Sequence, residues 1–262
     1  MNGAGNDFVM VDNRDLRFNL SQADIARLCD RHRGIGADGL IAVEPAQGSA
    51  HFRMRYYNAD GGEAEMCGNG ARCFGRFAAR FSGRTDFLKF ETLAGEITAE
   101  LLGDQVRLAM SQPHSLAIGV TLPVADQTLE VHFLNTGVPH AVVWMEDLPK
   151  TDVRTLGAAL RYHTHFAPKG TNANFAQRTG PGSIAIRTYE RGVEDETLAC
   201  GTGMVASALL AHKLFGMTSP IQVKVQGGDT LSVGFVARPD GFEKVTLTGP
   251  ADFVFEGVAP LS

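Results

Sequence analysis

The segment Cys67-Gly68-Asn69-Gly70 returns 133 positions later as Cys200-Gly201-Thr202-Gly203. The same offset relates further identical residues, and it is close to half of the 262 residues in the chain. A repeat at this spacing predicts two similar halves rather than a solenoid, which stacks many short repeats. The additional matched residues are Glu63, Ala78 and Gly83 in the first half and Glu196, Ala211 and Gly216 in the second.

Strands dominate the predicted elements, and one long helix follows each Cys-Gly-x-Gly segment. The alternating residues of 86–110, separated by turn residues, are typical of an antiparallel meander. The helices predicted at 67–82 and 200–215 carry unusually little polar surface, which indicates that each is buried. We therefore predict an α+β fold of two pseudo-symmetric lobes, each a mostly antiparallel sheet or barrel wrapped around a central helix. The other predicted elements are helices at 21–33 and 152–162 and strands near 40–44, 51–58, 128–135, 140–145, 172–178, 183–190, 220–225, 230–236, 244–248 and 252–256.

The composition is that of a globular protein, with 44% hydrophobic and 20% charged residues. The net charge is −5 and the basic residues are scattered, which argues against the basic face that nucleic-acid binding needs. No apolar run approaches the roughly 20 residues of a membrane span. The N-terminus has no segment typical of a signal peptide, so we expect a cytoplasmic protein whose four cysteines stay reduced.

The two Cys-Gly-x-Gly segments combine an anion site with a reactive thiol. The first N–H groups of a helix have no helical partner and attract anions, and the same position lowers a thiol pKa. Stereoinversion needs a base on one face of a carbon and an acid on the other, roles that Cys67 and Cys200 can exchange. We therefore expect a cofactor-independent amino-acid racemase or epimerase with Cys67 and Cys200 as catalytic residues. None of the six lysines lies in a motif for pyridoxal phosphate.

Other roles for cysteines stay open at this point. A single cysteine is most often a small buried hydrophobic residue, and we interpret Cys29 and Cys73 in this way. No metal site is expected, because the sequence has no CxxC pair and no histidine at ligand spacing beside Cys67 or Cys200. If the lobes face each other, a Cys67–Cys200 disulfide would also be feasible, as an oxidised and inactive form.

Eight motifs are distributed along nearly the whole chain. They are GAGNDF at 3–8, RHRGIGADG at 31–39, YNADG at 57–61, MCGNGARC at 66–73, GVPH at 137–140, GTN at 170–172, YERG at 189–192 and TLACGTG at 197–203. This set resembles the diaminopimelate epimerase family. The resemblance implies an N-terminal lobe of 1–112 plus about 250–262 that carries Cys67. It implies a C-terminal lobe of 113–249 that carries Cys200.

The resemblance also implies the reaction and the partners. The activity would be an isomerase that interconverts LL- and meso-diaminopimelate in lysine and peptidoglycan precursor biosynthesis, with no cofactor and as a homodimer. The carboxylate of the reacting end would bind main-chain N–H groups of Gly68, Asn69, Gly201 and Thr202.

The second amino-acid end of the substrate requires its own recognition site. An arginine can bind a carboxylate at two points, a carboxylate can accept from an ammonium group, and amides can serve either. The resemblance also gives His140 and Glu190 a part in tuning the thiol pKa values. The residues implied to bind the distal end are Asn6, Asn58, Asn172, Glu190 and Arg191.

Three departures from the family pattern concern substrate binding and the start of the chain. Many relatives carry glutamine where Gly39 stands and asparagine where Val138 stands, so two polar contacts to substrate are lost here. The chain begins inside the first motif, so we expect either upstream residues or a shortened opening strand. Two alternatives stay open: a related two-cysteine racemase acting on proline, hydroxyproline or histidine, and a non-catalytic protein that binds a carboxylated small molecule.

Overall fold

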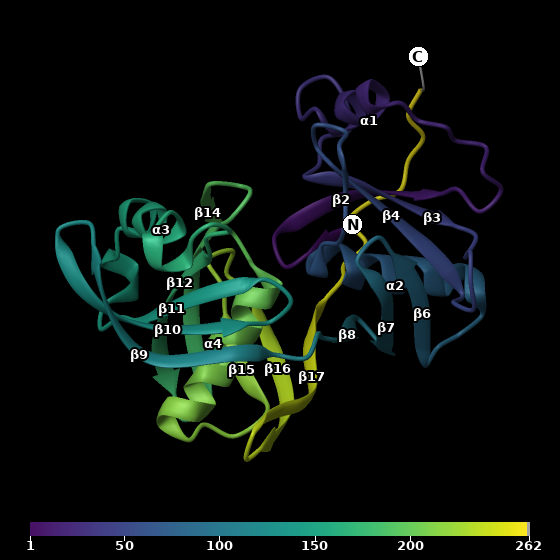
Figure 1. Ribbon diagram of the computed structural model, residues 1–262. Coiled ribbons are helices and arrows are strands. Elements are labelled where there is room, and N and C mark those ends of the chain that lie inside the picture. The colour runs from purple at the N-terminus through teal and green to yellow at the C-terminus, as the bar shows by residue number, and fades with distance from the viewer. Residues whose placement is uncertain (261–262) are drawn as a thin grey trace. The chain divides into compact units, whose positions relative to one another are not determined.

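The computed structural model describes residues 1–260. The chain divides into two units, each of which is described by itself (Figure 1). The first unit comprises Met1–Ala109 and the segment that begins at Gly249, and the second comprises Met110–Thr248. Residues 261–262, which the sequence prediction places in the first lobe, lie outside the described residues.

The first unit is a mixed sheet with two helices. Strand β2 pairs in parallel with β3, β3 antiparallel with β4, and β4 in parallel with β6. β6, β7 and β8 form the predicted antiparallel meander, and β1 pairs antiparallel with β2. The elements are β1 (Asn2–Gly3), β2 (Asn6–Asp12), α1 (Gln22–Cys29), β3 (Gly39–Glu44), β4 (Phe52–Asn58), β5 (Glu63–Ala64), α2 (Gly68–Ser82), β6 (Phe87–Thr92), β7 (Gly95–Leu102) and β8 (Gln105–Ala109).

The second unit repeats this pattern of pairing. β11 pairs in parallel with β12, β12 antiparallel with β13, β13 in parallel with β15, and β15, β16 and β17 are antiparallel. A hairpin of β9 and β10 extends the sheet beside β11. The elements are β9 (His114–Val124), β10 (Gln127–Asn135), β11 (Pro139–Trp144), η1 (Leu148–Lys150), α3 (Val153–Arg161), η2 (Thr164–Phe166), β12 (Asn172–Gly180), β13 (Ser183–Glu190), β14 (Asp195–Thr197), α4 (Gly201–Phe215), β15 (Ile221–Lys224), β16 (Thr230–Arg238) and β17 (Gly241–Pro250).

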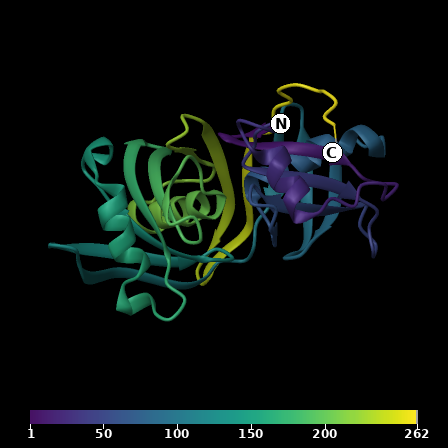
Figure 2. The same ribbon diagram turned by 90° about the horizontal axis from the view of Figure 1, so that it is seen from above.

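The central helices confirm the sequence repeat. α2 and α4 each have 15 residues and each ends at a glycine, Gly83 or Gly216, with φ of 67°. This left-handed conformation favours glycine, which explains why a glycine recurs at the helix end. α2 packs against strands β1–β4, β7 and β8 of the first unit. α4 packs against β10–β13, β15 and β16 of the second, and lies among them in Figures 1 and 2.

The two central helices differ in polarity. α4 is apolar nearly all round and buries its residues from Gly203 to Ala211, as predicted. The prediction of little polar surface was wrong for α2, which carries three arginines one turn apart. Arg72 is fully buried, whereas the side chains of Arg76 and Arg80 are 23% and 48% exposed. One face of α2 therefore passes from the core to the solvent along its length.

Some predicted boundaries need correction. α1 begins as predicted at the Ser21 cap but ends at Cys29, because the Asp30 carboxylate accepts from the N–H groups of His32 and Arg33. The strand predicted at 252–256 is absent from the described structure, where only Asp252 forms a bridge, to Asn2. The strand at 114–124 was not predicted. Most of its residues are exposed, so it lacks the apolar alternation of a half-buried strand.

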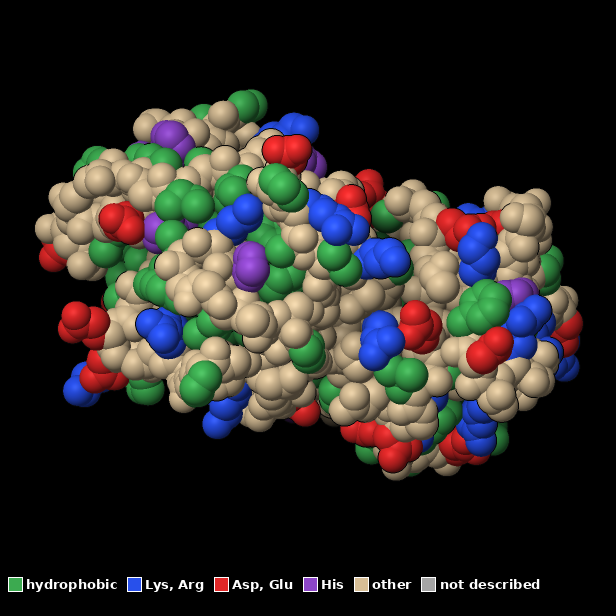
Figure 3. All heavy atoms as spheres, turned by 90° about the horizontal axis from the view of Figure 1, so that it is seen from below, with side chains coloured by type: hydrophobic (Ala, Val, Ile, Leu, Met, Phe, Trp, Pro, Cys, Tyr) green, Lys and Arg blue, Asp and Glu red, His purple; other side chains and the backbone are tan. Residues whose placement is uncertain are grey.

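The surface carries charges of both signs. On the face in Figure 3, lysine and arginine side chains are scattered among aspartates and glutamates rather than gathered in one patch. Within residues 1–260, no helix is long and apolar enough to cross a membrane.

Candidate active site

Cys67 and Cys200 occupy equivalent positions in the two units. Each is the N-cap of its central helix with an extended backbone, at φ −135° and ψ 122° for Cys67 and φ −118° and ψ 108° for Cys200. Each main-chain oxygen accepts the first helical hydrogen bond, from Ala71 at 2.7 Å and from Met204 at 2.9 Å. The prediction that both cysteines start a helix is therefore confirmed. A helix start offers main-chain N–H groups and a positive dipole end to an anion.

An ion pair anchors the segment that leads to each cysteine. The Arg55 guanidinium donates to both carboxylate oxygens of Glu63 at 2.8 Å. The Arg187 guanidinium donates in the same way to Glu196, at 2.7 and 2.9 Å. The pairs connect β4 with β5 and β13 with β14, the strands that precede α2 and α4. They explain why glutamate recurs four residues before each cysteine.

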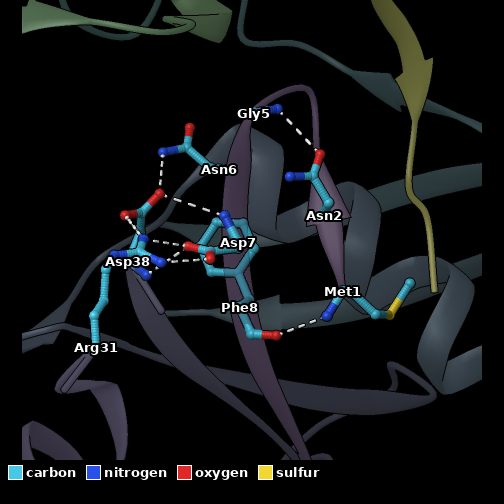
Figure 4. A network of polar contacts seen from close by, with 8 residues as sticks. All are labelled: Met1, Asn2, Gly5, Asn6, Asp7, Phe8, Arg31 and Asp38. Atoms are coloured by element: carbon cyan, nitrogen blue, oxygen red, sulfur yellow. Dashed lines mark hydrogen bonds and ion pairs between the residues drawn. The ribbon is translucent and has the colours of Figure 1, made fainter. Parts of the chain in front are cut away.

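Beside Cys67, two amide side chains contact each other. Asn69, which is 3% exposed, donates through Nδ2 to Oδ1 of Asn6. Nδ2 of Asn6 donates to Asp38 Oδ2 at 2.9 Å, and Figure 4 shows Asp38 between Asn6 and Arg31. Gly68 faces open space, since a Cβ there would meet no atom within 4 Å. The structure thus gathers three predicted site residues, Asn6, Gly68 and Asn69, at the start of α2.

Asn58 lies at the exposed end of β4, opposite Gly39 of β3. The Tyr56 hydroxyl donates to Oδ1 of Asn58 at 2.8 Å, so the Asn58 amide directs its N–H groups elsewhere. Gly39 has no room for a side chain, because a Cβ would lie 2.4 Å from Tyr57 O and 2.8 Å from Tyr56 Cε2. Tyr56 therefore occupies part of the space that a side chain at position 39 would need.

Beside Cys200, polar side chains support the start of α4. The Cys200 Sγ lies 3.7 Å from the Thr202 hydroxyl. The hydroxyl of buried Thr136 donates to the main-chain oxygen of Thr202 at 2.9 Å. A Cβ at Gly203 would lie 2.3 Å from Asn174 Oδ1 and 3.4 Å from Cys200 Sγ. Only glycine at position 203 therefore allows the Asn174 amide to pack against the helix behind the thiol.

His140 is fully buried and neutral. Desolvation, with a smaller effect from the charge of Arg191, lowers the pKa of His140 to about 3. Nδ2 of Asn174 lies 3.1 Å from His140 Nδ1, which must accept, so the ring proton is assigned to Nε2. His140 Nε2 has no hydrogen-bond partner among residues 1–260. His140 can therefore influence its surroundings as a neutral donor, not as a cation.

The residues predicted for the distal end lie in the second unit, apart from Asn6 and Asn58. Burial raises the pKa of Glu190, and the Thr197 hydroxyl, which donates to it at 2.8 Å, acts in the opposite direction. Asn172 is buried, and its amide accepts from the Arg191 N–H at 2.8 Å and donates to Pro139 O at 3.0 Å. The Asn172 side chain thus connects the main chain at Arg191 with the main chain at Pro139.

A cavity of about 500 Å³ opens beside the Arg191 side chain. Within the described residues that line it there are basic side chains but no carboxylate. The cationic side chains of Lys169 and Arg191 thus lie among apolar ones in this lining. The lining residues are Ala117, Phe133, Asn135, Gly137, Pro139, His165, Phe166, Ala167, Pro168, Lys169, Gly170 and Arg191.

The remaining cysteines fit the prediction of buried hydrophobic residues. Burial raises the pKa of Cys73 to about 12 and that of Cys29 to about 11, so neither forms thiolate near neutral pH. All four cysteines lie in the described part of the chain and none is in a disulfide.

Known proteins are similar to this chain in sequence. The sequence model of the diaminopimelate epimerase family matches residues 1–115 and 132–254. The diaminopimelate epimerase of Chlorobaculum tepidum is 44% identical over 265 residues, covering 100% of both chains. The chain belongs to the diaminopimelate epimerase family. The enzyme of that name from Hydrogenobaculum is 42% identical, covering 98% of this chain and 95% of its own.

The fold of this diaminopimelate epimerase family member extends to more distant proteins. A putative phenazine biosynthesis protein from Clostridium difficile superposes with a TM-score of 0.71 at 11% identity, covering 98% of this chain and 94% of its own. A probable proline racemase from Agrobacterium radiobacter gives 0.66 at 19% identity, covering 90% and 80%. At these identities the likeness shows the fold alone.

Sequence reasoning missed several supporting residues around the family's motifs. Asp38 and Arg72 lie within quoted motifs but were not singled out, and their contacts to Asn6 and Asn69 became visible only in the fold. Thr136 and Asn174 lie next to motifs, and neither recurs at the repeat offset. Val138, the other departure, uses its main-chain oxygen to accept from Thr136 N–H in the turn before β11.

Proposed function

We propose that this chain interconverts LL- and meso-diaminopimelate by proton transfer between two thiols, those of Cys67 and Cys200. The observation that carries the proposal is the duplicated N-cap cysteine, at the start of two helices of equal length. Family membership supplies the substrate. Cysteines used only for packing would not need to recur at a helix start with an adjacent glycine-rich turn.

In the proposed reaction, one cysteine begins as thiolate and the other as thiol. The thiolate removes the α-proton and becomes a thiol, and the electron pair of the broken C–H bond delocalises into the neighbouring carboxylate. The second thiol gives its proton to the opposite face of the carbon and becomes a thiolate. The protein thus ends with its thiol and thiolate exchanged, and the reverse reaction restores them.

Main-chain N–H groups at the helix starts stabilise the developing charge. The carboxylate gains negative charge as the proton leaves, so donors aimed at it bind the transition state more tightly than the ground state. We assign this task to Gly68, Asn69, Gly201 and Thr202. The open space beside Gly68 supports the assignment in the first unit.

The distal end of diaminopimelate carries a second carboxylate and a second ammonium group. We assign the carboxylate to Arg191, which is half-buried beside the cavity, and the ammonium to Glu190, which is also half-buried. Asn6 and Asn58 complete the recognition, and Asn172 contributes by holding the Arg191 backbone. The part in tuning the thiols that the family resemblance gives to His140 is assigned to it as a neutral group.

Two further features are proposed from the family and from cysteine chemistry. A cytoplasmic location agrees with four cysteines that form no disulfide. A homodimer is proposed from the family resemblance alone, and sedimentation at several protein concentrations tests it.

Alanine variants test the reaction. A positioned acid or base contributes about 10²–10⁴-fold to rate, so Cys67→Ala and Cys200→Ala should each lower turnover of LL-diaminopimelate by about a hundredfold or more. Cys73→Ala is the matched control, because Cys73 lies in α2, the helix that Cys67 caps. This variant should keep near-normal turnover and lose only some stability from packing. Near-normal turnover by Cys67→Ala or Cys200→Ala in both directions would contradict the two-thiol scheme.

A substrate panel separates the proposal from its alternative. Wild-type protein is assayed with LL-diaminopimelate, L-proline, trans-4-hydroxy-L-proline and L-histidine. The distal-site assignment requires the highest kcat/KM for diaminopimelate. Faster turnover of any one-ended substrate would favour the related racemase activity instead.

A further inference from the structure

We infer that Asp38 and Arg72 are positioning residues that fix the amide orientations of Asn6 and Asn69 beside Cys67. This inference rests on the proposed function, in which the Asn6 amide and the Asn69 main-chain N–H bind the substrate. It assigns a role to a buried arginine and an aspartate that the two-thiol reaction does not otherwise use.

Asp38 fixes the first amide through its charge. Its Oδ2 accepts from Asn6 Nδ2 at 2.9 Å, while its Oδ1 accepts from Arg31 at 2.8 Å (Figure 4). Arg31 also donates to both oxygens of Asp7, at 2.8 and 2.9 Å, and the Asp38 N–H donates to Asp7. An ionised carboxylate only accepts, so the nitrogen of the Asn6 amide must face Asp38.

Arg72 fixes the second amide from the opposite end. Its guanidinium donates to Asn69 Oδ1 at 2.9 Å and to the main-chain oxygens of Gly3 and Pro250 at 3.3 and 3.2 Å. Guanidinium only donates, so the oxygen of the Asn69 amide must face Arg72. Asn69 Nδ2 then donates to Asn6 Oδ1, and this hydrogen bond links the two amides.

The chain of contacts therefore runs from an anion, Asp38, through two amides to a cation, Arg72. A flipped amide would place oxygen against a carboxylate or nitrogen against a guanidinium, which costs free energy at either end. The orientation leaves one N–H of Asn6, which is half-exposed, for a ligand. Asn6 therefore presents a donor, and the substrate group that suits a donor is a carboxylate rather than an ammonium.

The second unit has no equivalent chain of contacts among its described residues. At the repeat offset, Thr202 corresponds to Asn69 and Val205 to Arg72. The support of the helix start there comes from Thr136 and Asn174. These contacts thus support only the helix start at Cys67, and a substitution in them can be tested without altering the helix start at Cys200.

The first test replaces Asp38 by Asn, which keeps the shape but removes the charge that orients Asn6. We expect kcat/KM for LL-diaminopimelate to fall about tenfold or more, mainly through KM, as for a lost charge-assisted hydrogen bond. Asp12→Asn is the control, because it also removes the charge of a carboxylate that pairs with an arginine, Arg14, but at the end of β2 away from Asn6. Equal kinetics of the two variants would overturn the inference.

A double variant distinguishes positioning from a merely structural role. Asn6→Asp with Asp38→Asn restores a carboxylate facing an amide and keeps the acceptor for Asn69, but it removes the Asn6 donor. We expect thermal stability to recover from that of Asp38→Asn while kcat/KM stays low. Recovery of kcat/KM together with stability would show that only the structural contact matters, and would overturn the inference.

The Arg72 end provides an independent arm if Asp38→Asn fails to fold. Arg72→Met removes the donor while keeping most of the side-chain length. It leaves the buried oxygens of Asn69, Gly3 and Pro250 without this donor, so its kinetics are measured well below its own melting temperature. We expect kcat/KM to fall about tenfold or more, whereas Arg76→Met, one turn later in α2, should change it less than about twofold. No difference between them would contradict the inference. An inactive wild-type protein would instead contradict the proposed function.

Discussion

At the scale of single residues, the neutral form of His140 in the second unit is maintained by burial and by its polar neighbours. His140, Asn174 and Thr188 form a chain in which the Thr188 hydroxyl donates to Asn174 Oδ1 at 3.0 Å. Asn174 in turn donates to Ala141 O at 3.0 Å and lies against His140. A proton added to His140 Nδ1 would remove the acceptor that Asn174 Nδ2 faces, so the network disfavours the charged form of His140.

The low pKa of His140 predicts how stability depends on pH. Its folded pKa of about 3 lies below the ordinary value of 6.5, so the unfolded chain binds a proton that the folded chain excludes. The stabilisation is present above pH 6.5 and is lost as pH falls toward 3. Within that window a single such group changes the free energy of unfolding by about 1.4 kcal/mol per pH unit.

Urea unfolding of wild type and His140→Gln between pH 6 and 4.5 measures this slope. Glutamine can still accept from Asn174 but does not titrate, so the variant should show a slope smaller by about 1 kcal/mol per pH unit. His165→Gln, at an exposed position, is the control and should match wild type. Identical slopes for His140→Gln and wild type would mean that His140 does not exclude a proton.

At the scale of elements, the repeat predicts the central helices well and their surroundings less well. α2 and α4 begin after the two cysteines and end at Ser82 and Phe215, as predicted, because the glycines mark both ends. The burial of Arg72 could not be predicted, since an arginine in a helix normally indicates an exposed face. It depends on oxygens from Gly3 and Pro250, which are distant in sequence.

The duplicated ion pairs predict an order of stability losses. The side chains of Arg187 and Glu196 are 17% and 15% exposed, and those of Arg55 and Glu63 are 32% and 29% exposed. Water screens the second pair more, so Glu196→Gln should lower the free energy of unfolding by about 1–3 kcal/mol and Glu63→Gln by about 0.5–1.5 kcal/mol.

The surface pair of Glu100 with Arg107 provides the control for this series. It is more exposed than either anchoring pair, so Glu100→Gln should cost less than about 0.5 kcal/mol. Urea unfolding of the three variants at pH 7 gives the order. An equal loss for all three would show that the anchoring pairs are no more than surface contacts.

At the scale of the whole molecule, one scaffold is used twice with different polar interiors. Both units join a parallel strand pair to an antiparallel pair and then a central helix. The first unit supports its cysteine end with Asp38, Arg72 and two amides, and the second with Thr136 and Asn174. The shared scaffold is visible in the sequence because cysteines and glycines recur. The supports differ between the units, so no repeat signals them.

The central claim is that two different thiols handle the departing and the arriving proton. The most direct measurement is the deuterium content of meso-diaminopimelate formed from LL-diaminopimelate in D2O during the first few per cent of turnover. The donating thiol exchanges with solvent before it acts, so two thiols predict one deuterium at the inverted α-carbon in essentially all new product. Early product that retains the substrate's own hydrogen at that carbon would show that a single group removes and returns the proton, and would contradict the account.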